Sequence, residues 1–192
     1  NDTIKNIFEE AKSIDDFAII SPVNTDINHP NYKSSGKIFT TNIIEADSVD
    51  GFAMLINKKK FEKNNFFDEN FFLFLENDDL CKRTKILGNN IYVIKNAFID
   101  HKGFSSSTKI DKDELEYLRN WHWMWSKFYF NKKHNGFFQA FIFILPSFFS
   151  SILKILLFTL LLNNKKSKIY QFRFFGILNS IIGKTSWYRI KD

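Results

Sequence analysis

An apolar run from Phe137 to Leu162 constrains the fold more than any other feature, because its 26 residues carry one charge, Lys154. As a straight helix rising about 1.5 Å per residue, the run would reach across a hydrocarbon core of roughly 30 Å. Pro146 interrupts the run, however, and Lys154 lies in the middle of the remainder. Two shorter helices, bent at Pro146 and lying in a membrane interface, agree better with these features. A single spanning helix and a buried core hairpin remain as alternatives.

Charge is distributed unevenly along the chain. Residues 1–110 hold 14 basic and 16 acidic side chains, whereas residues 111–192 hold 13 basic and 5 acidic ones, with no Asp or Glu from Tyr117 to Lys191. A basic, aromatic segment suits an anionic membrane surface. Nucleic acid is also anionic, but a long uncharged run binds no phosphate, so we expect no nucleic-acid partner. Residues 111–192 are therefore predicted to be a helical membrane-associated region with its hydrophobic segment at 137–162.

Residues 1–110 alternate between strand-like and helix-like runs, which predicts the α/β class. A helix is expected within "NDDLCKRTKILGNN", because acids come first, bases follow and Gly88 provides a stop. Cys81 is the single cysteine, which excludes a disulfide framework and a multi-cysteine zinc site. The expected strands are Phe17–Val23, Ser48–Asn57 and Ile91–Ile99, and a short helix is expected to begin at Asp2 or Thr3.

Several carboxylates lie in one of the most aromatic stretches of the chain, "FFDENFFLFLENDDLCKR". If a helix begins near Glu76, then Glu76 and Asp79 project from neighbouring positions, while Asp78 points elsewhere. Such a pair can act as a base and a hydrogen-bond acceptor, or can hold a divalent cation. Ordinary helix capping by the same acids is the alternative. The phenylalanines expected to wall this acid pocket are Phe66, Phe67, Phe71, Phe72 and Phe74.

The segment from Ser48 to Ser107 resembles the C-terminal half of the GT-A catalytic domain of family 2 glycosyltransferases, and in particular its rhamnosyltransferase-like bacterial members. The resemblance rests on "VDGFAMLINKKKFE", on "FFDENFFLFLENDDLCKR", and on a helix closed by "LGNNIYVIKNAFIDHKGFSS". It implies that residues 1–110 form the acceptor-side half of an incomplete GT-A domain. It places the nucleotide-binding half upstream of Asn1, so the chain alone is expected to be an inactive fragment.

The resemblance also implies catalytic roles. In that family a carboxylate of the "E..D" segment is the general base of an inverting displacement at the anomeric carbon of the sugar. Carried onto this chain, the base would be Glu76 or Asp79 ahead of Asp78. Many relatives carry a further acid where this chain has Asn77, and an amide cannot take up a proton.

Binding roles follow from the same resemblance. Gly51 and Phe52 would lie on the acceptor side of the pocket, where a missing side chain lets substrate approach the backbone. His101 matches a family histidine that in some members contacts the metal or the donor diphosphate. A packed or hydrogen-bonded structural histidine is the alternative. A divalent cation, Mg or Mn, is implied mainly for the nucleotide-binding half.

Together these features suggest a bacterial membrane-associated glycosyltransferase on the cytoplasmic face of the cell membrane. The resemblance implies transfer of a sugar from a nucleotide-sugar donor to a glycan or lipid-linked acceptor of the cell surface. The alternative is a non-enzymatic, membrane-anchored interaction module. In that case the acids would be helix caps and the hydrophobic region would be only an anchor.

Overall fold

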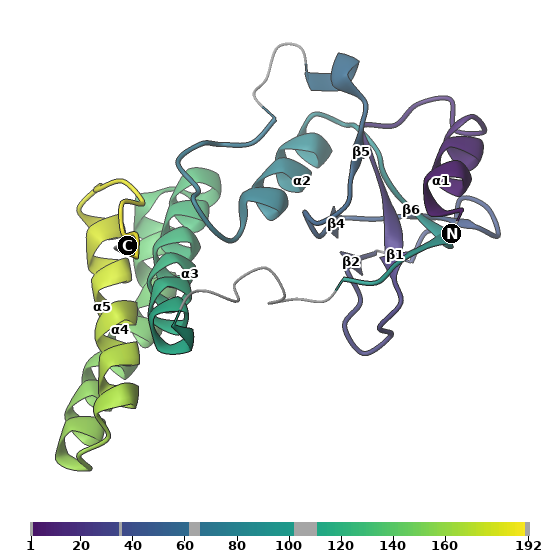
Figure 1. Cartoon of the computed structure of the whole chain (residues 1–192). Helices are drawn as coiled ribbons and strands as arrows, with labels where there is room; N and C mark the ends of the chain where they lie inside the picture. The colour runs from purple at the N-terminus through teal and green to yellow at the C-terminus, as the bar shows by residue number, and fades with distance from the viewer. Residues whose placement is uncertain (1, 35, 62–65, 102–110, 191–192) are drawn as a thin grey trace. The chain divides into compact units, whose positions relative to one another are not determined.

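The structure is a computed structural model, and it describes residues 2–34, 36–61, 66–101 and 111–190. The chain divides into two compact units (Figure 1). Unit 1 comprises Asn1–Asp68 and Glu76–Ser105, and unit 2 comprises Glu69–Leu75 and Ser106–Asp192. The predicted boundary at residue 110 lies outside the described residues. Helices and a mixed sheet are both present, so the α/β class is confirmed.

Unit 1 is built on a four-stranded sheet. Its central strands, β1 (Ile19–Asn24) and β6 (Ile91–Ile99), run parallel, and each carries a short antiparallel strand on its outer side. Those outer strands are β5 (Leu55–Ile56) beside β1 and β3 (Ile43–Glu45) beside β6. The strands predicted at Phe17–Val23 and Ile91–Ile99 are confirmed. Near-continuous apolar sequence is typical of strands that are covered on both faces.

The single strand predicted for Ser48–Asn57 is wrong. The segment forms two short strands, β4 (Ser48–Val49) and β5, separated by a turn at residues 50–53. Asp and Gly are depleted in strands, which explains why the chain turns at this point. The two pieces then pair with different partners, β4 with β2 (Tyr32–Lys33) and β5 with β1.

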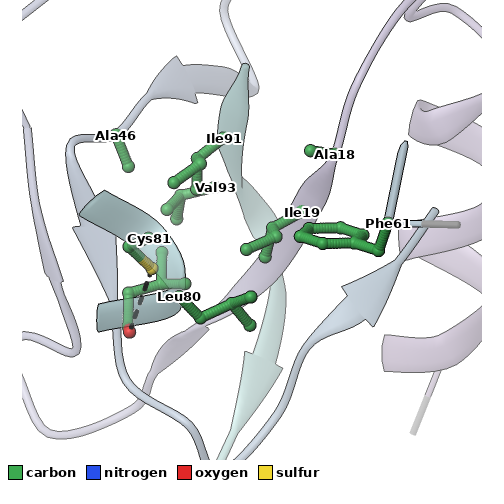
Figure 2. Close-up of a cluster of buried hydrophobic side chains, with 9 residues drawn as sticks. Ala18, Ile19, Ala46, Phe61, Leu80, Cys81, Ile91 and Val93 are labelled. Carbon is green, nitrogen blue, oxygen red and sulfur yellow. Dashed lines mark hydrogen bonds between the residues drawn. The ribbon is translucent and has the colours of Figure 1, made fainter. Parts of the chain in front are cut away.

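Two helices cover the two faces of the sheet in unit 1. Alternate residues of a strand point to opposite faces, so Ile20 and Ile94 pack against α1 (Thr3–Ala11), while Ile19 and Val93 pack against α2 (Glu76–Ile86). Figure 2 shows Leu80 and Cys81 of α2 among the side chains of that second cluster. The helix α2 therefore lies against the sheet at a fixed place, which positions its first turn.

The boundaries of α2 agree with the sequence prediction. Three acids lie in its first turn, two bases lie in its last turn, and Gly88 follows with φ of 74°. This left-handed conformation suits glycine at a helix C-terminus. A short 3-10 helix, η1 (Lys58–Phe61), precedes α2 in the chain and buries Phe61 in the same core.

Unit 2 consists of three helices packed side by side, α3 (Lys112–Asn135), α4 (Phe137–Leu160) and α5 (Asn164–Ile181) (Figure 1). Gly176 of α5 allows that helix to lie close to α3, because a Cβ atom at this position would collide with the backbone oxygen of Trp121. The acids at the start of α3 pair with bases at the start of α5. These ion pairs join Lys165 to Asp113 and Glu116, and Lys168 to Glu114.

Helix α4 is continuous, so the two shorter helices predicted on either side of Pro146 are wrong. A proline inside a helix removes one hydrogen bond and costs about 3 kcal/mol, which packing of α4 along α3 and α5 can offset. Among the described residues α4 is the helix long and apolar enough to cross a membrane, and only 11% of its most apolar stretch is buried. Phe138, Leu153 and Leu160 are among its exposed side chains.

Candidate functional site

The first turn of α2 is fastened to the turn that follows β4. The side-chain amide of Asn77 donates a hydrogen bond to the Val49 carbonyl oxygen at 3.0 Å. A Cβ atom at Gly51 would meet the Cβ atom of Asn77 at 3.4 Å, so glycine lets the two segments approach closely. The structure therefore brings the predicted residue Gly51 directly against the acidic start of α2.

Two carboxylates lie near one another at this place. The pKa of Asp50 is raised, first by partial loss of solvation and second by the negative charge of Asp78. Positive charge on His101 and Lys33 acts on the same carboxyl in the opposite direction. The Lys33 ammonium nitrogen lies 3.9 Å from a carboxylate oxygen of Asp78, whose side chain is 27% exposed. Asp50 is exposed as well, so substrate in solution can reach both carboxylates.

An aromatic pair lies beside these acids. The rings of Phe52 and His101 are stacked, with centroids 4.3 Å apart and an angle of 3° between their planes. The backbone N–H of His101 donates to the side-chain oxygen of Asn24, at the end of β1, over 3.5 Å. The predicted residues Phe52 and His101 therefore contact each other, and the field of His101 reaches Asp50.

Asp79 has a different environment. Its side chain is 0% exposed, and one of its carboxylate oxygens accepts a hydrogen bond of 2.8 Å from Nε of Arg83. Arg83 in turn donates to the carbonyl oxygen of Phe66 at 2.7 Å. A buried carboxylate with an arginine partner holds the local fold together and is inaccessible to an acceptor hydroxyl. The geometry therefore favours Asp78 over Asp79 as a group that meets substrate.

Glu76, the first residue of α2, has one carboxylate oxygen that is buried and that has no hydrogen-bond partner among the described residues. A buried polar atom without a partner costs free energy, roughly 1–3 kcal/mol, so such atoms tend to mark places where a further group binds. Glu76 thus keeps the candidate role that the sequence gives it. The sequence prediction missed Asp50 and Lys33, although Asp50 directly precedes Gly51 in the motif "VDGF".

A cation site is not assembled by the described residues. No three His, Cys, Asp or Glu side chains in that part of the chain gather as a group that could hold a metal ion. His101, which the resemblance implies as a metal contact, is stacked on Phe52. The described residues therefore do not fit a bound divalent cation by themselves, and no chemical step is assigned to one.

Comparison of the chain with protein-family models, with curated proteins and with solved structures found no match. The chemistry available at this site follows from its own geometry. That geometry comprises two accessible carboxylates, one lysine, a stacked aromatic pair and a glycine turn, all belonging to unit 1.

Proposed function

We propose that the chain supplies the acceptor side of a sugar-transfer site in a membrane-associated glycosyltransferase. The observation that carries the proposal is the pair Asp50 and Asp78, two accessible carboxylates close enough for one to raise the pKa of the other. The resemblance of "VDGF" and of the acidic start of α2 to family 2 GT-A enzymes supports the same assignment. A GT-A domain is the finer fold that this proposal assumes for unit 1.

The reaction needs a group that takes a proton from the acceptor. The oxygen of an acceptor hydroxyl attacks the anomeric carbon of the donor sugar, and the bond from that carbon to the donor diphosphate breaks. The diphosphate leaves with the bonding electron pair, and attack from the opposite face inverts the anomeric carbon. The hydroxyl proton passes to a carboxylate, and efficient bases have a pKa close to the working pH.

Asp50 is the candidate for this group, because it is exposed and its pKa is raised, first by partial loss of solvation and second by the charge of Asp78. Asp78 lies in the first turn of α2, where the helix dipole stabilises negative charge. The charge of Asp78 then increases the proton affinity of Asp50, a division of roles typical of paired catalytic carboxylates. Lys33 partly balances the two negative charges.

The other residues of the site suit acceptor binding. The stacked pair of Phe52 and His101 provides a flat apolar surface beside the carboxylates, of a kind suited to the face of a sugar ring. Gly51 exposes backbone at the same turn, and one carboxylate oxygen of Glu76, although buried, has no hydrogen-bond partner among the described residues. In this proposal Asp79 acts only through the fold of α2.

Unit 2 supports the membrane part of the proposal. The exposed apolar side chains of α4 suit contact with lipid, and the aromatic and basic residues of α3 and α5 suit the headgroup region. We assign the protein to the cytoplasmic face of the cell membrane, where a nucleotide-sugar donor and a lipid-linked or cell-surface glycan acceptor can meet.

The test uses the protein expressed from its complete gene, in isolated membranes supplied with a panel of radiolabelled nucleotide sugars. Transfer of label to a glycan or lipid fraction is expected to fall about 10²- to 10⁴-fold in Asp50→Asn, the range for loss of general-base catalysis. A fall of about tenfold or more is expected in Asp78→Asn. The matched control is Asp47→Asn, an exposed acid three positions before Asp50, which should leave transfer unchanged.

The same experiment separates the proposal from a non-enzymatic anchored module. If no donor in the panel gives transfer while the protein still binds membranes, the module is favoured. If label is transferred but Asp50→Asn and Asp78→Asn match Asp47→Asn, the assignment of the carboxylates is wrong.

A further inference from the structure

A polar pocket of about 310 Å³ lies on unit 2 between α4 and α5. Its lining includes Ser147, Ser150, Ser151 and Lys154 from α4, together with Tyr170 and Arg173 from α5. Ligand pockets commonly begin at about 300 Å³, so the space suits a small ligand or the headgroup of a larger one. Polar side chains gathered midway along the most apolar helix of the chain are unexpected for a structural contact alone.

The cations of this pocket have no carboxylate partner among the described residues. Arg173 donates to the side-chain oxygen of Asn120 at 3.2 Å, and burial lowers its pKa. The Lys154 ammonium lies 4.9 Å from the centroid of the Tyr170 ring. Lys127 of α3 does not line the pocket, but its pKa is lowered first by burial and second by the positive charge of Arg173.

The nearby acids are already engaged elsewhere. Asp113, Glu114 and Glu116 at the start of α3 pair with Lys165 and Lys168. No Asp or Glu follows until the end of the chain. Positive charges held together without a counterion repel one another, so a bound anion would stabilise this part of unit 2.

Hydroxyl groups complete the set of donors. The hydroxyl of Ser151 donates a hydrogen bond to the carbonyl oxygen of Ser147 at 2.7 Å. The hydroxyls of Ser147 and Ser150 make no hydrogen bond to another described residue, so both can donate into the pocket. Two cations and two free hydroxyls match the oxygens of a phosphate monoester, which carries close to two negative charges at pH 7.

We propose that this pocket binds the phosphate monoester headgroup of a membrane lipid. Exposed apolar side chains of α4 flank the pocket residues in sequence, among them Phe149, Leu153 and Leu157, and they can contact acyl or polyprenyl chains. A soluble phosphate compound would make no use of this apolar surface.

A headgroup site at this place also determines the depth at which α4 lies in the membrane. Unpaired cations at the centre of a hydrocarbon layer are costly, whereas cations at headgroup depth are favourable. A phosphate bound midway along α4 therefore requires that the helix lie in the membrane interface. This inference concerns unit 2 alone and does not depend on sugar transfer by unit 1.

The test measures co-flotation of the full chain with vesicles of phosphatidylcholine that contain either phosphatidate or phosphatidylglycerol. The two lipids differ in presenting a phosphate monoester or a phosphodiester, and their fractions are adjusted to equal surface charge. The wild-type chain is expected to bind phosphatidate vesicles at least tenfold more tightly. The double variant K154Q/R173Q should lose that preference, while K112Q/K184Q, with the same charge change on exposed lysines outside the pocket, should keep it.

Two further measurements keep the test decisive. Ser147→Ala combined with Ser150→Ala leaves all charges in place and should reduce the preference severalfold, and Arg173→Lys should retain part of it if folding of Arg173→Gln is impaired. Equal binding to both kinds of vesicle, or equal losses in the two double variants, would overturn the site. Displacement of the chain from phosphatidate vesicles by millimolar inorganic phosphate would show a soluble-phosphate site and would overturn the lipid assignment.

Discussion

The two units bury their apolar residues to different degrees. Unit 1 packs aliphatic side chains on both faces of a sheet, whereas unit 2 packs aromatic helices and leaves most of α4 uncovered. Their polar groups differ as well. Accessible carboxylates gather in unit 1, whereas the pocket of unit 2 holds two cations, Lys154 and Arg173, that have no carboxylate partner in the part of the chain that the structure describes. This difference is what the proposed function requires, with unit 1 in water and α4 of unit 2 in contact with lipid.

Each unit contains its own reporter, which allows the comparison to be tested on one chain. Cys81, the single cysteine, is buried in unit 1, and its pKa is raised to about 11, chiefly by burial, so it reacts slowly until that unit opens. All four tryptophans belong to unit 2. Thiol labelling in denaturant therefore follows unit 1, and tryptophan fluorescence follows unit 2, with the protein held in mild detergent.

The largest effect on stability is expected from Asp79→Ala. Removing the fully buried Asp79 carboxylate breaks its ion pair with Arg83, and breaking a buried ion pair costs about 3–5 kcal/mol. The denaturant midpoint of Cys81 labelling should fall accordingly, while the tryptophan signal should respond less. Asp78→Ala on the same helical turn is the control, and it should cost about 1 kcal/mol or less because its pairing with Lys33 is long and partly exposed.

The opposite pattern would reassign the base. If Asp79→Ala left the labelling midpoint unchanged but abolished sugar transfer, the reactive carboxylate would be Asp79, one of the two residues that the family resemblance favours, and the proposed roles of Asp50 and Asp78 would be wrong.

Acid should weaken unit 2 through His122. Burial lowers the pKa of this histidine from 6.5 to about 4, and its ring nitrogens contact the Ser186 hydroxyl and the Tyr188 carbonyl oxygen at 2.8 and 2.9 Å. As the pH falls, the unfolded chain takes up a proton on His122 before the folded chain does. The contribution of the neutral His122 ring to stability is therefore fully present above pH 6.5 and is lost as the pH falls towards 4. The loss is about 3 kcal/mol, measurable as the pH dependence of the fluorescence midpoint.

A pair of variants assigns this acid sensitivity to one residue. His122→Gln should flatten the decline in stability between pH 6.5 and 4, since it removes the titrating ring. His134→Gln, on the same helix, should leave the decline as it is in the wild type. Equal slopes in all three proteins would show that carboxylate ion pairs, such as that of Asp113 with Lys165, cause the change instead.

Close packing of α3 and α5 predicts a loss in Gly176→Ala. The added methyl group would collide with the backbone oxygen of Trp121, and backbone moves less readily than a side chain. The expected cost is about 3 kcal/mol, the upper part of the range for overpacking, and should appear first in tryptophan fluorescence. Gln171 is an exposed residue about one and a half turns earlier on α5. Gln171→Ala should change the free energy of unfolding of unit 2 by less than about 0.5 kcal/mol.

Local signals in the sequence were sufficient for some elements. Acids, bases and Gly88 predict the ends of α2, and a continuous apolar run predicts β6, because both patterns depend on neighbouring residues alone. The partners of the phenylalanines before α2 could not be predicted in this way. Phe71, Phe72 and Phe74 contact aromatic side chains of α3 within unit 2. Phenylalanine has no local preference that reveals its distant partner.

The candidate site shows the same limit. The order of the motifs was enough to predict Gly51, Phe52 and His101 as site residues. Asp50 was not predicted, because its place near Asp78 depends on the turn between β4 and β5. The sequence also placed Asp79 ahead of Asp78 as the base, because the helical period gives the direction of a side chain but not its burial, and Asp79 is fully buried. The prediction of a break at Pro146 was wrong, because tertiary packing of α4 outweighed the free-energy cost of a proline inside the helix.

The smallest expected effect compares two aspartates that look equivalent in the sequence. Asp111 and Asp2 are both N-cap residues, but only Asp111 makes a side-chain capping bond, accepting from the backbone N–H of Asp113 at 3.1 Å. Asp111→Ala should therefore lower the free energy of unfolding of unit 2, followed by tryptophan fluorescence, by about 1 kcal/mol. Asp2→Ala should change Cys81 labelling in unit 1 by only a few tenths, because the helix dipole alone is affected. Equal losses at the two sites would show that the helix dipole, and not the capping hydrogen bond, stabilises these N-termini.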